Sequence, residues 1–253
     1  MEQLPVHNSA EVVAAKKATV YEALLRLSPR LGSGNFAAIG DGDLALLFGL
    51  YDREFFDGWL ASAVAKQAEK PLALRVSATM TRSGGKTTRF RRRGRDGQFR
   101  DRYEIAIAGR LLLLTFGDVD RPVVVCGLTC RDRLDALQRI MEHEIIHLAE
   151  LLVWGSTSCS TRRFKNIAGR IFGHADTKHD LVTPHERASV QHGVSVGSQV
   201  EFDFNGRQMV GRVNRISQRA TVLVPAEAGR RYTDGGTYDK YYIPVPMLRP
   251  VCT

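Results

Sequence analysis

The chain has 253 residues, with 36 Lys and Arg against 27 Asp and Glu, which gives a formal net charge of +9. This length accommodates one large domain or two small ones, and 43% hydrophobic with 25% charged residues excludes a wholly disordered chain. The longest apolar runs, 111–114 and 122–126, are too short to cross a bilayer.

The remaining composition bears on compartment and partners. Residues 1–12 contain neither a basic n-region nor an apolar h-region, so we expect no secretory signal and a cytoplasmic protein without a membrane partner. Free thiols are expected rather than a disulfide scaffold, because the cysteines are few and scattered; they are Cys126, Cys130, Cys159 and Cys252. The positive charge favours a polyanionic partner but does not identify one.

The first half of the chain alternates between helical and extended patterns. Apolar residues at helical spacing predict a helix over 9–27 and a second, unusually aromatic helical stretch over 43–64. Alternation predicts a strand over 72–80. The pattern of residues 103–116 predicts another strand, a tight turn at Gly109, and then a short helix or a second strand.

Most of the positive charge lies between these extended segments. Nine basic and only two acidic residues occur from Arg82 to Arg102, interleaved with aromatic residues. Arginines neutralise phosphates and aromatic rings stack on unpaired bases, which indicates a contact with nucleic acid such as DNA. The alternative is a solvated hairpin tip. The candidate nucleic-acid-binding residues are Arg89, Arg91, Arg92, Arg93 and Arg95.

The strongest helix is predicted over 131–154, with Thr129 as its N-cap and Gly155 as its end. A further helix is expected from about 160 to 172, ending at Gly173. The following polar segment, 179–193, has no clear period and is interpreted as a linker. Beyond it, short strands predominate, with Asn205-Gly206 predicted to form a type I′ hairpin turn. Residues 194–253 therefore predict a small SH3-like β-barrel.

The motif that carries chemistry lies on the strongest helix, where residues 143–147 read His-Glu-Ile-Ile-His. Histidines four residues apart share one helical face and can bind the same metal ion, while the glutamate between them can take a proton from water. His143 and His147 border the apolar arc of the helix, and Glu144 falls inside it. A carboxylate there is costly unless a metal, a proton or a donor satisfies it, which favours Zn2+ over two solvated histidines.

A third ligand has to come from outside this motif. Glu150 shares the histidine face but lies almost a turn further along, so it is expected at most to support the ligands. The downstream candidates are Cys159, Ser160, His174 and His179.

Residues 46–175 resemble the SprT-like metalloprotease domain. The matching elements occur in family order: an aromatic helix over 50–60, a glycine-containing strand pair over 79–88, an edge strand at 103–107 followed by 111–114, the motif at 143–147, and Phe164 to His174. The resemblance implies a zincin-like fold and a zinc-dependent peptidase that acts on protein, with His143 and His147 as metal ligands and Glu144 as the catalytic base.

The sequence departs from the family at the third ligand, where the family has a histidine and this chain has Ser160, with Cys159 beside it. Serine binds zinc poorly, whereas a cysteine near a helix N-terminus supplies a thiolate. We therefore expect Cys159 as the third ligand and His174 as the alternative, although His174 closes the far end of a helix of about 12 residues, about 18 Å away. A thiolate would reduce the Lewis acidity of zinc relative to a third imidazole, which bears on hydrolysis rather than on metal binding.

Together these interpretations predict an α+β protein. An N-terminal helical segment (1–40) precedes a SprT-like domain (41–178), a linker (179–193) and the barrel (194–253). The expected function is that of a SprT-like zinc metallopeptidase acting on DNA-associated protein. The alternative is a non-catalytic protein that binds zinc and nucleic acid.

Overall fold

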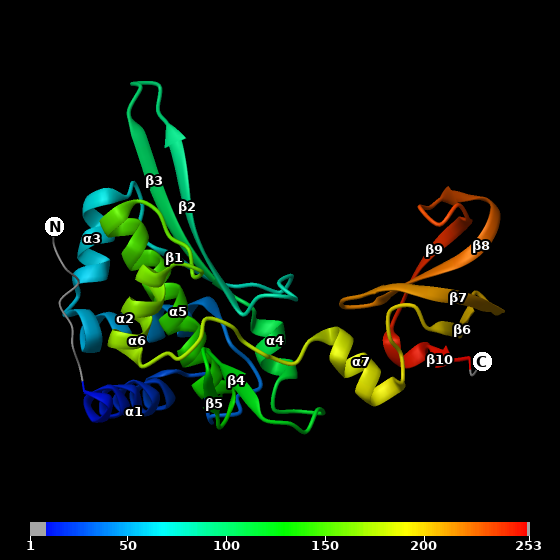
Figure 1. Ribbon diagram of the computed structural model, residues 1–253, viewed down its shortest axis with the longest axis horizontal. Coiled ribbons are helices and arrows are strands. Elements are labelled where there is room, and N and C mark those ends of the chain that lie inside the picture. The colour runs from blue at the N-terminus through cyan, green and yellow to red at the C-terminus, as the bar shows by residue number, and fades with distance from the viewer. Residues whose placement is uncertain (1–8, 252–253) are drawn as a thin grey trace. The chain divides into compact units, whose positions relative to one another are not determined.

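The computed structural model describes residues 9–251 (Figure 1). Residues 1–8, part of the stretch on which the expectation about a secretory signal rests, and Cys252 lie outside this range. The chain forms two compact units, residues up to 116 with 121–181, and residues 117–120 with 182 onward. Helices and sheets are both present, so the predicted α+β class is confirmed. No described helix is long and apolar enough to cross a membrane.

Within residues 9–251, six helices build the first unit: α1 (Ala10–Leu27), α2 (Asp41–Phe56), α3 (Trp59–Gln67), α4 (Gly109–Leu114), α5 (Arg133–Trp154) and α6 (Arg162–Phe172). The single helix predicted over 43–64 is wrong, because Asp57 adopts a left-handed conformation and separates α2 from α3. α1 shares the hydrophobic core with α2 and α5. The N-terminal helical segment is therefore part of this unit.

A three-stranded sheet lies beside α5 in the first unit. Its strands are β1 (Ala73–Val76), β2 (Gly85–Arg93) and β3 (Phe99–Ile107), in the order β1-β3-β2. β3 pairs parallel to β1 and antiparallel to β2. β2 is thus an edge strand, and Figure 1 shows it and β3 as a long hairpin. A separate hairpin consists of β4 (Val123–Val125) and β5 (Leu128–Cys130).

The central helix α5 is buried along most of its length. Thr129 lies in β5, so its prediction as the N-cap is wrong; the Asp132 carboxylate instead accepts the Asp135 backbone N–H at 2.8 Å. The helix ends at Gly155, as predicted. The core of the unit therefore surrounds the helix that carries the histidine motif.

The second unit contains α7 (Pro184–His192) and a five-stranded antiparallel sheet with its own core. The strands are β6 (Gln199–Phe204), β7 (Arg207–Ile216), β8 (Ala220–Arg231), β9 (Thr237–Ile243) and β10 (Arg249–Pro250), in the order β10-β6-β7-β8-β9. Asn205 and Gly206 both have positive φ angles between β6 and β7, which agrees with the predicted hairpin turn. The segment 179–193 is no plain linker, because α7 occupies much of it.

Candidate metal centre

The two histidines of the motif face one another on α5. Their Nε2 atoms are 3.1 Å apart. Two imidazole nitrogens bound to one tetrahedral zinc ion at about 2.0–2.1 Å would be about 3.3 Å apart. The helix therefore presents the pair of nitrogen atoms at a spacing that fits one ion.

The tautomer of His147 is determined by contacts beyond the helix. The Thr157 hydroxyl donates to Glu150 Oε2 at 2.6 Å, and it lies 2.6 Å from His147 Nδ1. Because the hydroxyl proton is directed at Glu150, the hydroxyl oxygen accepts from the Nδ1–H of His147. The lone pair of Nε2 is then available for a metal ion. Glu150 thus reaches His147 only through the Thr157 hydroxyl.

The environment of His143 also favours the neutral ring that a metal ligand requires. Its Nδ1 lies 3.8 Å from the sulfur of Cys126. Burial, reinforced by the neighbouring His147, lowers the pKa of His143 to about 3. Burial likewise lowers the pKa of His147 to about 4. Both rings are therefore neutral near pH 7.

Cys159 completes a group of three side chains whose types can bind a metal ion. It lies in the turn before α6, and its sulfur and the ring nitrogens of His143 and His147 all lie within 4.8 Å of one another. Two imidazoles and one thiol are ligands that suit zinc. Among the described residues, this is the group of His, Cys, Asp and Glu side chains gathered closely enough to hold an ion.

His174, the alternative third ligand, lies elsewhere. Its Nε2 is 2.7 Å from Glu142 Oε2 in the buried interior, and it does not belong to the group of ligand atoms around Cys159. The Ser160 hydroxyl contacts the Ser158 hydroxyl at 2.9 Å.

Glu144 lies beside the histidines and is only 3% exposed. Its Oε2 accepts a hydrogen bond from the Thr87 hydroxyl of β2 at 2.7 Å. Burial raises the pKa of Glu144 to about 7, although the bonds with Thr87 oppose the rise. The carboxylate fits because position 85 of β2 is glycine, where a Cβ atom would lie 2.6 Å from Glu144 Oε1.

These side chains line one cavity of about 410 Å3 in the first unit. One of its walls is the start of β2. Another wall is the segment 175–180. Its Asp180 N–H donates to the Val124 carbonyl of β4, and its Lys178 carbonyl accepts from the Cys126 N–H. The Gly84 N–H donates to His179 Nε2 at 2.7 Å and joins the two walls. The candidate ligands and Glu144 therefore lie in a cavity with room for a further molecule.

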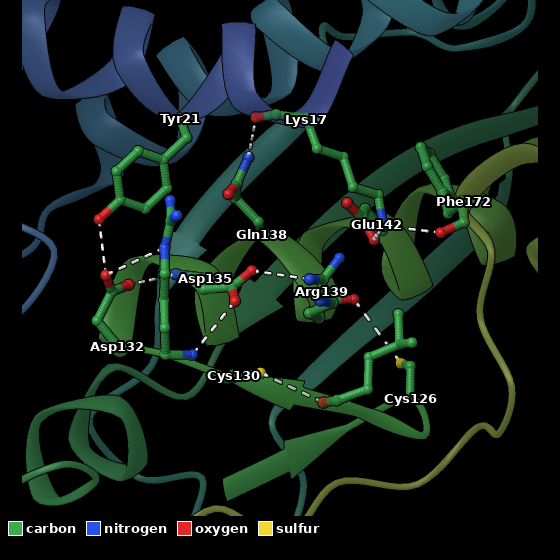
Figure 2. Close-up of polar contacts among 12 residues, drawn as sticks. Lys17, Tyr21, Cys126, Cys130, Asp132, Asp135, Gln138, Arg139, Glu142 and Phe172 are labelled. Atoms are coloured by element: carbon green, nitrogen blue, oxygen red, sulfur yellow. Dashed lines mark hydrogen bonds and ion pairs between the residues drawn. The ribbon is translucent and has the colours of Figure 1, made fainter. Parts of the chain in front are cut away.

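A second acid of α5, Glu142, faces away from the cavity into a network of buried contacts. Its carboxylate accepts a hydrogen bond from the Tyr51 hydroxyl at 2.7 Å. Its Oε2 also lies 2.7 Å from His174 Nε2 and 2.9 Å from Lys17 Nζ. Figure 2 shows Lys17 reaching from α1 to Glu142 and to the carbonyl of Phe172. Burial alone would raise the pKa of Glu142, but the charge of Lys17 and the bond with His174 hold it at about 2. This network connects α1, α2 and α5.

The arginine-rich stretch forms the outer part of the β2–β3 hairpin. Several of the predicted nucleic-acid-binding arginines already have partners. Arg91 binds both carboxylate oxygens of Asp101 at 2.8 and 2.9 Å, Arg92 reaches Glu69 at 3.3 Å, and Arg93 donates to the Gly97 carbonyl. Arg89 pairs with Tyr103 in the strand register, and Arg95 lies in the turn. The hairpin is cationic, but fewer of its arginines lack a partner than the sequence alone indicates.

The structure adds residues that the sequence did not single out for the site. These are Gly85 and Thr87 on β2, Cys126 in the turn after β4, and Thr157 after α5. The glycine-containing strand segment was the one available signal for the first two, because a glycine within a strand often marks a close approach.

Comparisons with protein-family models, with curated proteins and with solved structures gave no match.

Proposed function

We propose that the first unit is a zinc-dependent peptidase of SprT-like type, with His143, His147 and Cys159 as ligands. The observation that carries the proposal is the convergence of two neutral imidazoles and a thiol beside a buried carboxylate, at the wall of a cavity. A zinc ion bound there would act as a Lewis acid that polarises a carbonyl group and lowers the pKa of a water molecule.

In this proposal Glu144 moves the proton. A general base works best when its pKa is near the working pH, and burial brings the pKa of Glu144 to about 7. Its carboxylate accepts a proton from the attacking water and delivers it to the departing amine nitrogen. Thr87 holds one carboxylate oxygen through its hydroxyl, so the position of Glu144 relative to His143 and His147 is constrained.

The edge strand β2 supports a peptide as the substrate. β2 pairs with β3 on one side, and no other described strand pairs with its outer side. An extended peptide can add to such an edge through main-chain hydrogen bonds. Because residues 84–87 also line the cavity, a peptide added there would pass beside Glu144.

We also propose a zincin-like fold for the first unit and an SH3-like barrel for the second unit. In each unit the order of the helices and strands along the chain supports the proposal.

The test measures zinc per chain by elemental analysis and cleavage of casein. Wild type should bind one zinc and cleave casein, while Glu144→Gln should keep the zinc and lose cleavage. Cys159→Ala should lose most of the zinc, and His174→Ala serves as the matched control that keeps it. Full zinc retention by Cys159→Ala would refute the ligand assignment. Equal inertness of wild type and Glu144→Gln would refute the peptidase.

A second candidate function, nucleic-acid binding by the β2–β3 hairpin, is favoured by its exposed aromatic rings. Phe99 is 63% and Phe90 is 41% exposed, and each lies against an arginine: Arg91 is 5.4 Å from the Phe99 ring and Arg102 is 4.8 Å from the Phe90 ring. Rings exposed beside cations suit stacking on single-stranded bases. DNA-associated protein would then be the substrate class.

The hairpin is tested by DNA retention at rising salt. Changing Arg91, Arg92 and Arg93 to Ala should weaken binding of a single-stranded oligonucleotide and flatten its salt dependence. Unchanged retention would eliminate the hairpin as the contact. A protein that binds DNA and zinc but cleaves nothing would instead be the non-catalytic protein that the sequence left as the alternative.

A further inference from the structure

The sheet of the second unit buries one face and carries charged and aromatic side chains on the other. Val213, Val222 and Tyr241 are partners in the register of β7, β8 and β9, and they pack in the core of the unit. Successive residues of a strand point to opposite faces, so the neighbours of these three lie on the outer face. The cationic and aromatic residues of the outer face are Arg212, Arg215, Arg230, Tyr238, Lys240 and Tyr242.

A β-bulge brings two arginines of β7 to this face. Arg212 is the register partner of Leu223, and Arg215 is the partner of Thr221, two residues earlier on β8. Because Leu223 and Thr221 share a face, Arg212 and Arg215 share it too. The register shift between Val213 and Arg215 makes this possible. Without the extra residue, Arg215 would point to the core side of the sheet.

Strand β9 alternates aromatic and cationic residues on the same face. Tyr238, Lys240 and Tyr242 follow one another at intervals of two residues, which corresponds to about 7 Å. Lys240 is the register partner of Leu223, and Arg230 of β8 is the partner of Tyr238. The outer face therefore presents cations beside tyrosine rings.

Three of these cations have no partner. Within residues 9–251, the side chains of Arg215, Arg230 and Lys240 form no ion pair or hydrogen bond, and all three residues are exposed. Tyr242 is 60% exposed. An open aromatic ring thus shares the face with unpaired positive charges.

The acidic residues of this region do not neutralise the face. Asp234 is already bound by Arg212, and it accepts the Tyr238 hydroxyl at 3.2 Å. Asp239 is the partner of Val224, which packs against the core, so Asp239 lies on the other side of the sheet. Glu227 lies in the segment 226–229, which has no register partner on β9. The outer face therefore favours a negatively charged ligand.

We propose that the outer face of β7–β9 binds single-stranded nucleic acid. Tyr242 stacks on a base, and the three unpaired cations contact phosphates. Every base offers a flat ring and every nucleotide a phosphate, so this ligand matches both features of the face. An acidic peptide would match the charge but would leave the exposed ring unused. The site lies in the second unit and depends neither on the proposed peptidase nor on the β2–β3 hairpin.

The ring is tested with the full-length protein and a fluorescent oligothymidylate, whose binding is followed by anisotropy. Tyr242→Leu should weaken binding by about 5- to 100-fold, because stacking on one base is lost. Tyr242→Phe keeps the ring and should bind like wild type. Wild-type affinity in Tyr242→Leu, or equal weakening by the two variants, would overturn the proposal.

The cations are tested through the salt dependence of the same binding. Changing the three unpaired cations to Gln should reduce the slope of log K against log salt by about 2, because each phosphate contact on a single strand contributes about 0.7. The matched control changes two arginines and one lysine to Gln at exposed positions of the first unit and should keep the slope. These control positions are Arg26, Arg162 and Lys165. Equal slopes in the two triple variants would contradict the phosphate contacts.

A third measurement separates the outer face from the hairpin. Both tests are repeated in protein that carries Arg91→Ala, Arg92→Ala and Arg93→Ala, where changes on the outer face should still weaken binding. Complete loss of binding through the hairpin changes alone would overturn the proposal. So would a polyglutamate peptide that competes with the oligothymidylate at equal affinity, because the face would then recognise charge without a base.

Discussion

Glu142 and Glu144 lie two residues apart on α5 and are both buried, yet their environments are opposite. Glu142 contacts Tyr51, Lys17 and His174 and has a pKa of about 2. Glu144 has one side-chain partner, the Thr87 hydroxyl, and burial raises its pKa to about 7.

The difference shows that burial alone does not define the role of an acid. A buried carboxylate with a cation and several donors connects elements, and its loss leaves other charges uncompensated. A buried carboxylate with one neutral donor keeps a capacity for protons and is a candidate for chemistry. The direction of the pKa shift separates the two acids of α5, although both stand on the same helix.

The largest expected effect concerns Glu144. Glu144→Gln should lower kcat/KM for a peptide by about 10²–10⁴-fold, because proton transfer is removed while the shape of the side chain is kept. Its free energy of unfolding should not fall, since the amide needs no counter-charge. Stopped assays of peptide cleavage and urea denaturation measure the two quantities. A large loss of stability would mean that Glu144 is structural like Glu142.

The next effect concerns Glu142. Glu142→Gln should lower the free energy of unfolding by about 3–5 kcal/mol, because it leaves Lys17 buried without its negative partner. Glu104→Gln is the matched control. It removes a carboxylate from an ion pair with the half-exposed Arg75 and should cost about 1 kcal/mol or less. Urea denaturation at pH 7 compares the two variants. Equal losses would contradict the distinction between buried and surface acids.

The two acids should also act on stability in opposite pH ranges. A carboxyl group with a raised pKa in the folded state stabilises below its unfolded pKa of 4.5, and this stabilisation is lost as pH rises through about 7. Glu142, with its lowered pKa, stabilises above pH 4.5, and its contribution is lost as pH falls toward 2.

Metal-free protein in the presence of a chelator tests this for Glu144. The free energy of unfolding of wild type, relative to Glu144→Gln, should fall by about 3 kcal/mol between pH 4.5 and pH 8. The comparison with Glu144→Gln cancels the titration of the histidines, which both proteins share. A difference that is independent of pH would show that the carboxyl group has an ordinary pKa.

The smallest effect concerns the space around Glu144. Gly85→Ala would place a methyl group 2.6 Å from Glu144 Oε1 and 2.7 Å from its Cγ, so the side chain must move away from Thr87. We expect a loss of about 1–3 kcal/mol in the free energy of unfolding and a fall in peptide cleavage. Gly49→Ala in α2, where a Cβ meets no atom within 4 Å, is the control that should not destabilise. Unchanged cleavage in Gly85→Ala would show that Glu144 tolerates displacement.

Much of the site could be predicted from local sequence. The spacing of His143 and His147 follows from helix geometry, and the structure brings Cys159 to them. The contacts of Glu142 could not be predicted, because Lys17 lies 125 positions earlier in the chain and only tertiary packing brings it close.

The fold was predictable where period and turn chemistry agree. Helix α5 and the Asn205-Gly206 hairpin have both signals. Helix α7 was missed because its nine residues show no apolar period, although Thr183 as N-cap and Pro184 in the first turn are start signals. The pairing of Arg91 with Asp101 was also missed, since it depends on the strand register of β2 and β3.

The Thr157–Glu150 contact has a further consequence for the loop between α5 and α6. Arg163 at the start of α6 also binds Glu150, at 2.6 Å, and donates to the Ser156 carbonyl at 2.9 Å. The loop that carries Cys159 is therefore anchored to α5 from both of its ends before any ion arrives. Because its conformational entropy is already lost on folding, capture of an ion would not have to order it again, and the proposed ligand set would be preorganised.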